Sequence, residues 1–162
     1  MVGGYIMKSD LEGKHVFWDV DGVLAPFRFN NKVWPNVGYP SALTQEMVDN
    51  YCFYARSPCK LAQRIIRTSN AKQNVVLGKI AFSGEMAQKE LWLNQYFPEV
   101  KIRLWVSVKE DKGDILMSYM RDFKIPKEDV VFIDDTISEL LKAEQEYGIT
   151  AVHVSSLLNW EE

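Results

Sequence analysis

The chain has 162 residues and a mass of 18.7 kDa, the size of one ordinary domain. Apolar residues make up 47% and charged residues 25%, which excludes a disordered chain, and the net charge of −3 argues against a protein that mainly grips nucleic-acid phosphates. No apolar run approaches the roughly 18 to 20 residues that span a bilayer, so we expect no membrane segment and no export signal. Two cysteines, Cys52 and Cys59, are too few for a disulfide framework or a four-ligand zinc site. These features predict a single-domain cytoplasmic protein.

Short apolar segments alternate with helical patterns, and this alternation predicts a parallel sheet with helices on both faces. Asn30-Asn31, between two short apolar runs, indicates a small hairpin because Asn tolerates the left-handed turn conformation. The elements expected in the first half are a strand over 15–18, a loop-rich stretch over 22–40 with the hairpin over 27–34, a helix from Thr44 to about Arg56, and a second helix started by Ser57-Pro58.

The second half continues the same alternation. Its expected elements are a strand over 75–82, a helix opened by Ser83-Gly84 and stopped by Pro98, a strand over 102–108, a helix preceded by Lys112-Gly113, and then a strand over 130–133, a helix over 137–147 and a strand over 149–154. The fold class is therefore a three-layer, Rossmann-like α/β domain over 1–162. Within it, residues 22–72 form a hairpin and helical insert.

Two pairs of carboxylates follow predicted strands. Asp19 and Asp21 end the first strand in HVFWDVDGVL, and Asp134 and Asp135 end a later one in VVFIDDT. Ligands of open α/β sheets bind outside such strand ends, so neighbouring strands would bring four carboxylates together. Two unit charges 4 Å apart repel by about 4 kcal/mol at an effective dielectric near 20, and a hard cation offsets that repulsion. An all-oxygen ligand set favours Mg²⁺ over zinc.

Each motif also has a simpler interpretation. A DxD or a DD alone is often a turn or a helix cap, but both at strand ends in one small α/β chain are hard to call accidental. Ser83 and the adjacent Gly84 stand where a helix N-terminus could hold a phosphoryl oxygen, although Ser83 could be only an N-cap. Lys112 stands before a helix, where the dipole does not favour a cation; it could be a solvated lysine, and Lys109 competes with it.

These motifs resemble those of the haloacid dehalogenase superfamily of hydrolases. The resemblance runs over about residues 14 to 154, in the order DVDGV (19–23), a strand ending in Ser83, Lys112, and FIDDTISEL (132–140). It implies a Rossmann-like core, a loop-and-hairpin insert after the first motif, and Mg²⁺ as cofactor. The hairpin expected over 27–34 falls where such an insert belongs.

The resemblance also implies a role for each motif residue. Asp19 matches the nucleophile that forms an aspartyl-phosphate, and Asp21 matches the general acid/base, whose backbone carbonyl also ligates the metal. Ser83, with the neighbouring Gly84, would bind the transferred phosphoryl group. Lys112 would neutralise charge on the nucleophile and the phosphate.

The last motif would supply the remaining metal ligands. Asp135 aligns best with the metal-ligating acid of the family, while Asp134 occupies a place often taken by glycine. Glu139 matches the second acid of this motif, with Glu where Asp is commoner, and it would act through water or only close the site. Asp19 completes the expected metal ligands together with Asp21.

An acid at position 21 implies phosphate-ester chemistry within this family, because its phosphatases and phosphomutases carry one and its dehalogenases do not. The expected function is a phosphatase for a small phosphorylated metabolite, such as a nucleotide or sugar phosphate. A phosphomutase shares the first step. Phosphatases of a phosphorylated protein or nucleic-acid end, and a catalytically silent binding subunit, are the alternatives.

The spacing of the motifs limits the size of any cap over the site. The stretch from Asp21 to Ser83 leaves room for at most a reduced helical cap, and the stretch from Ser83 to Lys112 leaves none for a large one. An open site would admit a bulky substrate or be closed by a second copy in a homo-oligomer.

Overall fold

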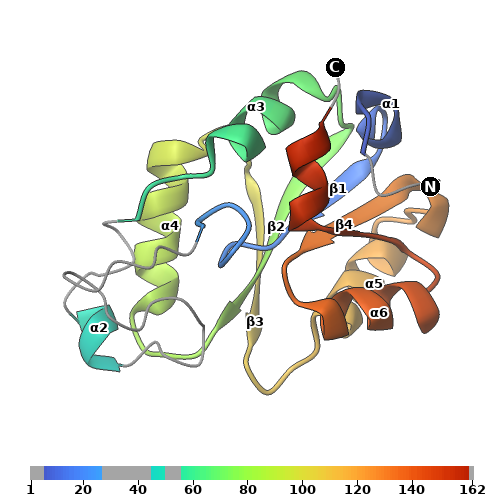
Figure 1. Ribbon diagram of the computed structural model, residues 1–162. Helices are drawn as coiled ribbons and strands as arrows, with labels where there is room; N and C mark the ends of the chain where they lie inside the picture. The colour runs from blue at the N-terminus through green and yellow to red at the C-terminus, as the bar shows by residue number, and fades with distance from the viewer. Residues whose placement is uncertain (1–5, 27–44, 50–55, 161–162) are drawn as a thin grey trace.

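The computed structural model describes residues 6–26, 45–49 and 56–160 (Figure 1). Within these ranges, five strands form one parallel sheet in the order β3-β2-β1-β4-β5. The strands are β1 (His15–Trp18), β2 (Gln73–Ile80), β3 (Ile102–Ser107), β4 (Val130–Asp134) and β5 (Thr150–His153). The predicted α/β class and its parallel sheet are confirmed.

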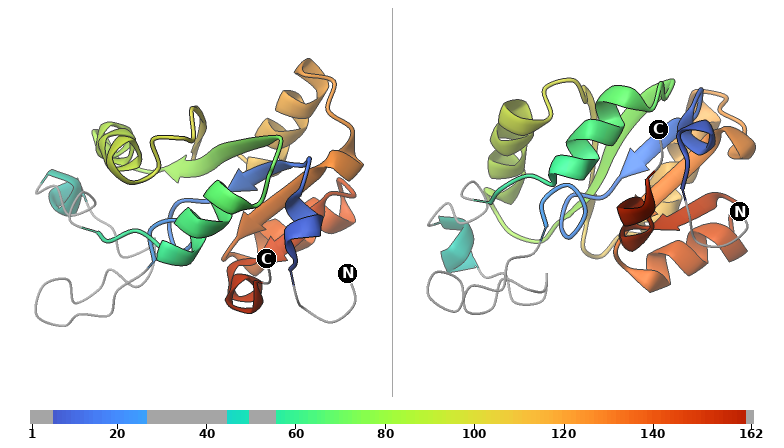
Figure 2. Two further views of the ribbon diagram at one scale, coloured as in Figure 1. Left: turned by 90° about the horizontal axis from the view of Figure 1, so that it is seen from above. Right: turned by 45° about the horizontal axis from the view of Figure 1, so that its top comes forward.

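Helices cover both faces of this sheet (Figures 1 and 2). On one face, Trp18 and Val76 pack in a core with residues of α3 and α4; on the other, Phe17 packs in a core with residues of α5 and α6. The helices are α1 (Lys8–Leu11), α2 (Gln45–Asp49), α3 (Lys60–Thr68), α4 (Glu85–Tyr96), α5 (Lys112–Asp122) and α6 (Ile137–Gln145), with 3-10 turns η2 (Lys127–Asp129) and η3 (Val154–Asn159). The three-layer prediction is confirmed.

The central position of β1 brings the motifs together at the carboxyl ends of the strands. Trp18, its last residue, lies in register with Val76 of β2 and Ile133 of β4. The residues that follow β1 and β4 therefore emerge side by side, as ligand sites of parallel sheets require.

The start of α3 differs from the sequence prediction. Cys59, rather than Ser57-Pro58, caps this helix, because its thiol accepts a hydrogen bond from the Ala62 N–H at 3.4 Å. The Cys59 N–H also donates to the Leu24 carbonyl at 2.8 Å, which fixes where the helix begins. Arg56 lies outside a helix, and the described part of the helix expected from Thr44 is α2. Thr44, Cys52 and the hairpin over 27–34 lie outside the described residues.

The end of β2 also differs. The strand ends at Ile80 instead of residue 82, because the Glu85 carboxylate accepts hydrogen bonds from the backbone N–H groups of Ala81 (2.7 Å) and Phe82 (3.0 Å). These bonds turn the backbone out of the sheet and into α4.

Among the described residues, none of the helices combines the length and apolar character needed to cross a bilayer.

Candidate active site

The loop after β1 is held by its own backbone. The Leu24 N–H donates to the Asp19 carbonyl at 3.4 Å and the Ala25 N–H to the Val20 carbonyl at 2.8 Å. Gly22 has a φ of +83°, a conformation that L side chains rarely adopt, so glycine suits this turn. The loop over 19–25 therefore sets the directions in which its acidic side chains leave the backbone.

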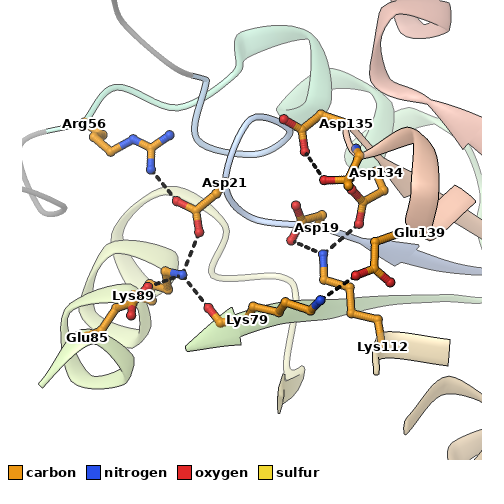
Figure 3. Close-up of polar contacts among 11 residues, drawn as sticks. Asp19, Asp21, Arg56, Lys79, Glu85, Lys89, Lys112, Asp134, Asp135 and Glu139 are labelled. Atoms are coloured by element: carbon orange, nitrogen blue, oxygen red, sulfur yellow. Dashed lines mark hydrogen bonds and ion pairs between the residues drawn. The ribbon is translucent and has the colours of Figure 1, made fainter. Parts of the chain in front are cut away.

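Three carboxylates meet at the end of β1 and β4, and we call them the acidic cluster. Asp19, Asp134 and Asp135 each offer an oxygen, and these oxygens lie within 4.8 Å of one another. The Lys112 ammonium bridges two of them, at 2.7 Å from both Asp19 Oδ1 and Asp134 Oδ2 (Figure 3). The structure thus brings together four of the residues that the sequence proposed for one site.

Lys112 is the first residue of α5 and not a residue before the helix. Asp111 caps that helix through a 2.7 Å bond from the Gly113 N–H, and a Cβ on Gly113 would collide with the ring of Tyr147. Lys112 is only 3% exposed, so its interpretation as a solvated surface lysine is wrong, whereas Lys109 is exposed. Close packing between α5 and Tyr147, which follows α6, therefore helps to hold the ammonium at the acidic cluster.

The acidic cluster is not balanced in charge. When all three carboxylates are ionised, they carry three negative charges against the single positive charge of Lys112, which leaves two negative charges. Burial raises the pKa of Asp19 to about 7, with Lys112 acting against this and Asp134 and Asp21 adding to it. Burial and the neighbouring Asp134 likewise raise the pKa of Asp135. Lys112 has a raised pKa, because Asp19 and Asp134 outweigh the effect of its burial.

The acidic cluster fits a hard divalent cation. Its donors are all carboxylate oxygens, the ligand type that Mg²⁺ prefers, and the two uncompensated negative charges equal the charge of one such ion. Asp134 is engaged on both sides, by Lys112 and by the Thr136 N–H at 2.7 Å. Asp135 is less enclosed and shares one 3.4 Å bond with the Thr136 hydroxyl.

Asp21 belongs to a second group of charges on the other side of the loop. Its Oδ1 lies 2.5 Å from Arg56 Nη1, and its Oδ2 lies 2.6 Å from Lys89 Nζ. Lys89 also pairs with Glu85 at 2.7 Å, and we call these four residues the charge quartet. In Figure 3 the Asp21 carboxylate points toward Arg56 and Lys89 and away from Lys112. The carboxylate oxygens of Asp21 therefore do not belong to the acidic cluster.

The charge quartet keeps Asp21 ionised. Burial alone would raise the pKa of Asp21, but Lys89 and Arg56 outweigh it and hold this pKa below its ordinary value. Burial acts in the opposite sense on Lys89, yet Asp21 and Glu85 raise its pKa. Assignment of Asp21 to the metal through its backbone carbonyl stays a prediction.

Ser83 and Gly84 lie where β2 turns into α4. Gly84 is the N-cap of α4, with a φ of +79°, so the interpretation of Ser83 as the N-cap is wrong. Gln45 of α2 donates to the Ser83 carbonyl at 3.0 Å and accepts from the Ser83 N–H at 3.2 Å. The Ser83 side chain is exposed. Its role toward a phosphoryl group stays a prediction.

Several charged residues of this region were not singled out in the sequence. Arg56 and Lys89 bind Asp21, and Lys79 of β2 forms an ion pair with Glu139. The spacing of Glu85 and Lys89, four residues apart on one helix, was a signal for their pairing. Nothing in the sequence indicated that this pair would face the loop after β1.

Comparisons with known proteins support the fold. The chain is similar to a haloacid dehalogenase-like family hydrolase from Streptococcus pneumoniae, with a TM-score of 0.55, 14% identity, and coverage of 93% of this chain and 91% of that one. It is also similar to the N-terminal part of a Bacteroides fragilis protein that contains a phosphatase domain and is complexed with Mg; the TM-score is 0.50 and the identity 17%. That match covers 87% of this chain and 36% of the other. No family model matches the sequence, and no curated protein matches it.

Proposed function

With its haloacid dehalogenase-like fold as the premise, we propose that this chain is a Mg²⁺-dependent phosphomonoester hydrolase that works through an aspartyl-phosphate on Asp19. The observation that carries the proposal is the position of Lys112, 2.7 Å from both Asp19 and Asp134, beside a third carboxylate. An anionic nucleophile can approach a phosphate dianion only where positive charge offsets the repulsion. The proposed substrate class is a small phosphorylated metabolite. The two similar solved structures, a hydrolase and a phosphatase domain, support hydrolysis as the reaction.

The metal would be held by Asp19, Asp134 and Asp135. Mg²⁺ bound there would offset the charge on the transferred phosphoryl group and orient it. Lys112 serves the same electrostatic purpose from the protein side. Its ammonium is buried, so its attraction for an anion is weakened less by water than that of an exposed lysine.

The proposed reaction has two displacement steps. In the first, an Asp19 carboxylate oxygen attacks phosphorus, the bond from phosphorus to the ester oxygen breaks, and that oxygen takes a proton from Asp21. Asp21 must be protonated for this step, although Lys89 and Arg56 hold its pKa below the ordinary value, and it regains the proton from water in the second step. In the second, a water oxygen attacks the phosphorus of the aspartyl-phosphate, the bond to Asp19 breaks, and Asp21 takes the proton of that water. The products are inorganic phosphate and a free Asp19 carboxylate. The ionised form of Asp21 favoured by the charge quartet is the form required for the second step.

Hydrolysis of p-nitrophenyl phosphate tests this proposal. We expect turnover with Mg²⁺, its loss in excess EDTA, and its loss in Asp19→Asn. Acid-quenched wild-type protein should carry one phosphate on the peptide that contains Asp19. Absence of turnover on this ester and on a broad panel of phosphorylated metabolites would exclude the enzyme function. Activity unchanged in EDTA would exclude the metal.

A further inference from the structure

We infer that Lys89 is a positioning residue for the second step of the reaction: it fixes the Asp21 carboxylate that takes the proton of the attacking water. This inference rests on the proposed function, because it requires an aspartyl-phosphate on Asp19. Lys89 lies on α4, which covers the face of the sheet opposite to that covered by α5. It acts through Asp21, not on the substrate itself.

The Lys89 ammonium is a fixed anchor. Within the described ranges its three protons meet three acceptors: Asp21 Oδ2 at 2.6 Å, Glu85 Oε1 at 2.7 Å and the Lys79 carbonyl at 2.7 Å. The side chain is 0% exposed, so bulk water does not reach these contacts. Glu85 is itself held by the backbone N–H groups of Ala81 and Phe82. Lys89 is thus bound to the loop after β1, to β2 and to its own helix at once.

This anchor decides the direction of one side chain. Backbone hydrogen bonds already hold the loop over 19–25, which leaves the Asp21 side chain as the part free to turn. Lys89 takes one carboxylate oxygen and Arg56 the other. Asp21 follows Asp19 by two residues on that loop, so the anchored carboxylate stays at the end of β1 with the proposed nucleophile. A base held beside the nucleophile is correctly placed for water that attacks a phosphate on that nucleophile.

A purely structural explanation accounts less well for the same contacts. Removing two charges from water costs several kcal/mol each, and well-packed apolar residues of similar volume often stabilise a fold as well or better. The core on this face of the sheet consists of such apolar residues, including Val20 and Trp92. A buried ion pair that ends on a loop two residues from the proposed nucleophile is better explained by the orientation that it imposes.

The test variant combines Lys89→Met with Glu85→Gln. It removes one positive and one negative charge, so no buried charge is left without its partner, and Asp21 still pairs with Arg56. The Gln side chain can still accept from the Ala81 and Phe82 N–H groups. Glu85→Gln alone is the reference, because Lys89 then still meets Asp21. Arg103→Met is a second control, since Arg103 of β3 is a half-buried cation that pairs with Glu90 of α4, and no contact with Asp21 is found among the described residues.

The readout is the pre-steady-state time course with p-nitrophenyl phosphate and Mg²⁺. p-Nitrophenolate leaves without help from an acid, so the first step should be spared. We expect the double variant to release about one equivalent of p-nitrophenolate in a burst and then to turn over roughly 10- to 100-fold more slowly than Glu85→Gln. Phosphate should accumulate on Asp19 in the same samples. Arg103→Met should show neither effect.

Three results would overturn the inference: no change in the steady rate, equal slowing of both phases, or slowing without phosphate on Asp19. A defect in folding alone would produce equal slowing, and thermal unfolding of each variant identifies it. If wild-type protein does not hydrolyse the ester, or if Asp19→Asn retains the rate, the proposed function is wrong, and the inference that rests on it is wrong as well. Wild-type turnover through Asp19, with no burst in the double variant, overturns the inference alone.

Discussion

The acidic cluster and the charge quartet flank the same loop but differ in charge. Ionised, the acidic cluster holds three carboxylates and one ammonium, a balance of two negative charges. The charge quartet holds two carboxylates and two cations, a balance of zero. The first therefore calls for a divalent cation, while the carboxylates and cations of the second offset one another. Two aspartates that are two residues apart can have different tasks because different partners surround them.

The largest expected effect comes from Asp21→Asn. This change removes the proposed acid/base while keeping the shape of the side chain, so we expect turnover to fall by roughly 10² to 10⁴. Binding of Mg²⁺ should stay close to that of wild type, because the Asp21 carboxylate lies in the charge quartet and not in the acidic cluster. Steady-state kinetics and a calorimetric Mg²⁺ titration on the same sample measure both. Equal activity in this variant would contradict the proposed role of Asp21.

Lys112→Met tests the other group of charges. It leaves three carboxylates without their cation, so we expect turnover to fall by roughly 10² to 10³. In EDTA the free energy of unfolding should fall by about 3 to 5 kcal/mol, because buried charges lose their partner, and saturating Mg²⁺ should recover part of it. Urea unfolding with and without metal measures this. The exposed Lys109→Met is the control, and a loss of the same size there would contradict the assignment of Lys112.

The pH dependence of stability provides a third test. The folded, metal-free protein holds the Asp19 proton with a pKa of about 7 against an ordinary 3.8. The protonated form is thus favoured by folding; its stabilising effect is full below pH 3.8, is lost as pH rises from there through about 7, and changes little above that. In EDTA we expect the unfolding temperature to fall by about 5 °C between pH 5 and pH 8. Calorimetric scans measure it.

Two controls belong to that experiment. Asp19→Asn removes the titrating group, so most of the fall should disappear, and saturating Mg²⁺ should remove it in wild-type protein. A fall of unchanged size in Asp19→Asn would show that another group titrates.

The smallest effect is expected from Gly113→Ala. The added Cβ collides with the ring of Tyr147, and such overpacking costs about 1 to 3 kcal/mol. Because Lys112 is the adjacent residue, turnover should also fall, but by less than in Lys112→Met. Thermal unfolding and steady-state kinetics measure both, with the exposed Arg121→Ala on the same helix as control. Unchanged stability would mean that the N-terminus of α5 can move away from Tyr147 at no cost, which would contradict the close packing at Gly113.

The sheet and the acidic cluster could be predicted from the sequence. Short apolar runs mark buried parallel strands, and acids placed directly after two of them must converge if those strands are neighbours. The registers of Trp18 with Ile133 and of Trp18 with Val76 meet that condition. The order of the motifs along the chain also pointed to Lys112 as a site residue. The hydrophobic periodicity alone would not have indicated that a lysine at the N-terminus of a helix is buried.

The charge quartet could not be predicted in the same way. Arg56 and Lys89 are distant from Asp21 in sequence, and charged residues on helices usually face water. The burial of Arg56 and Lys89 depends on how α4 packs against the segment that leads into α3. The Trp92 indole, which donates to the Arg56 carbonyl at 2.8 Å, is part of that packing.

The central position of β1 has a consequence for how this scaffold can change. Its loop receives Lys112 from the layer that contains α5 and Lys89 from the layer that contains α4. The proposed nucleophile and the proposed proton carrier thus have their charged partners on opposite sides of the sheet. Substitutions in one layer can retune the first without disturbing the second, which makes the two halves of the chemistry separately adjustable by mutation or by design.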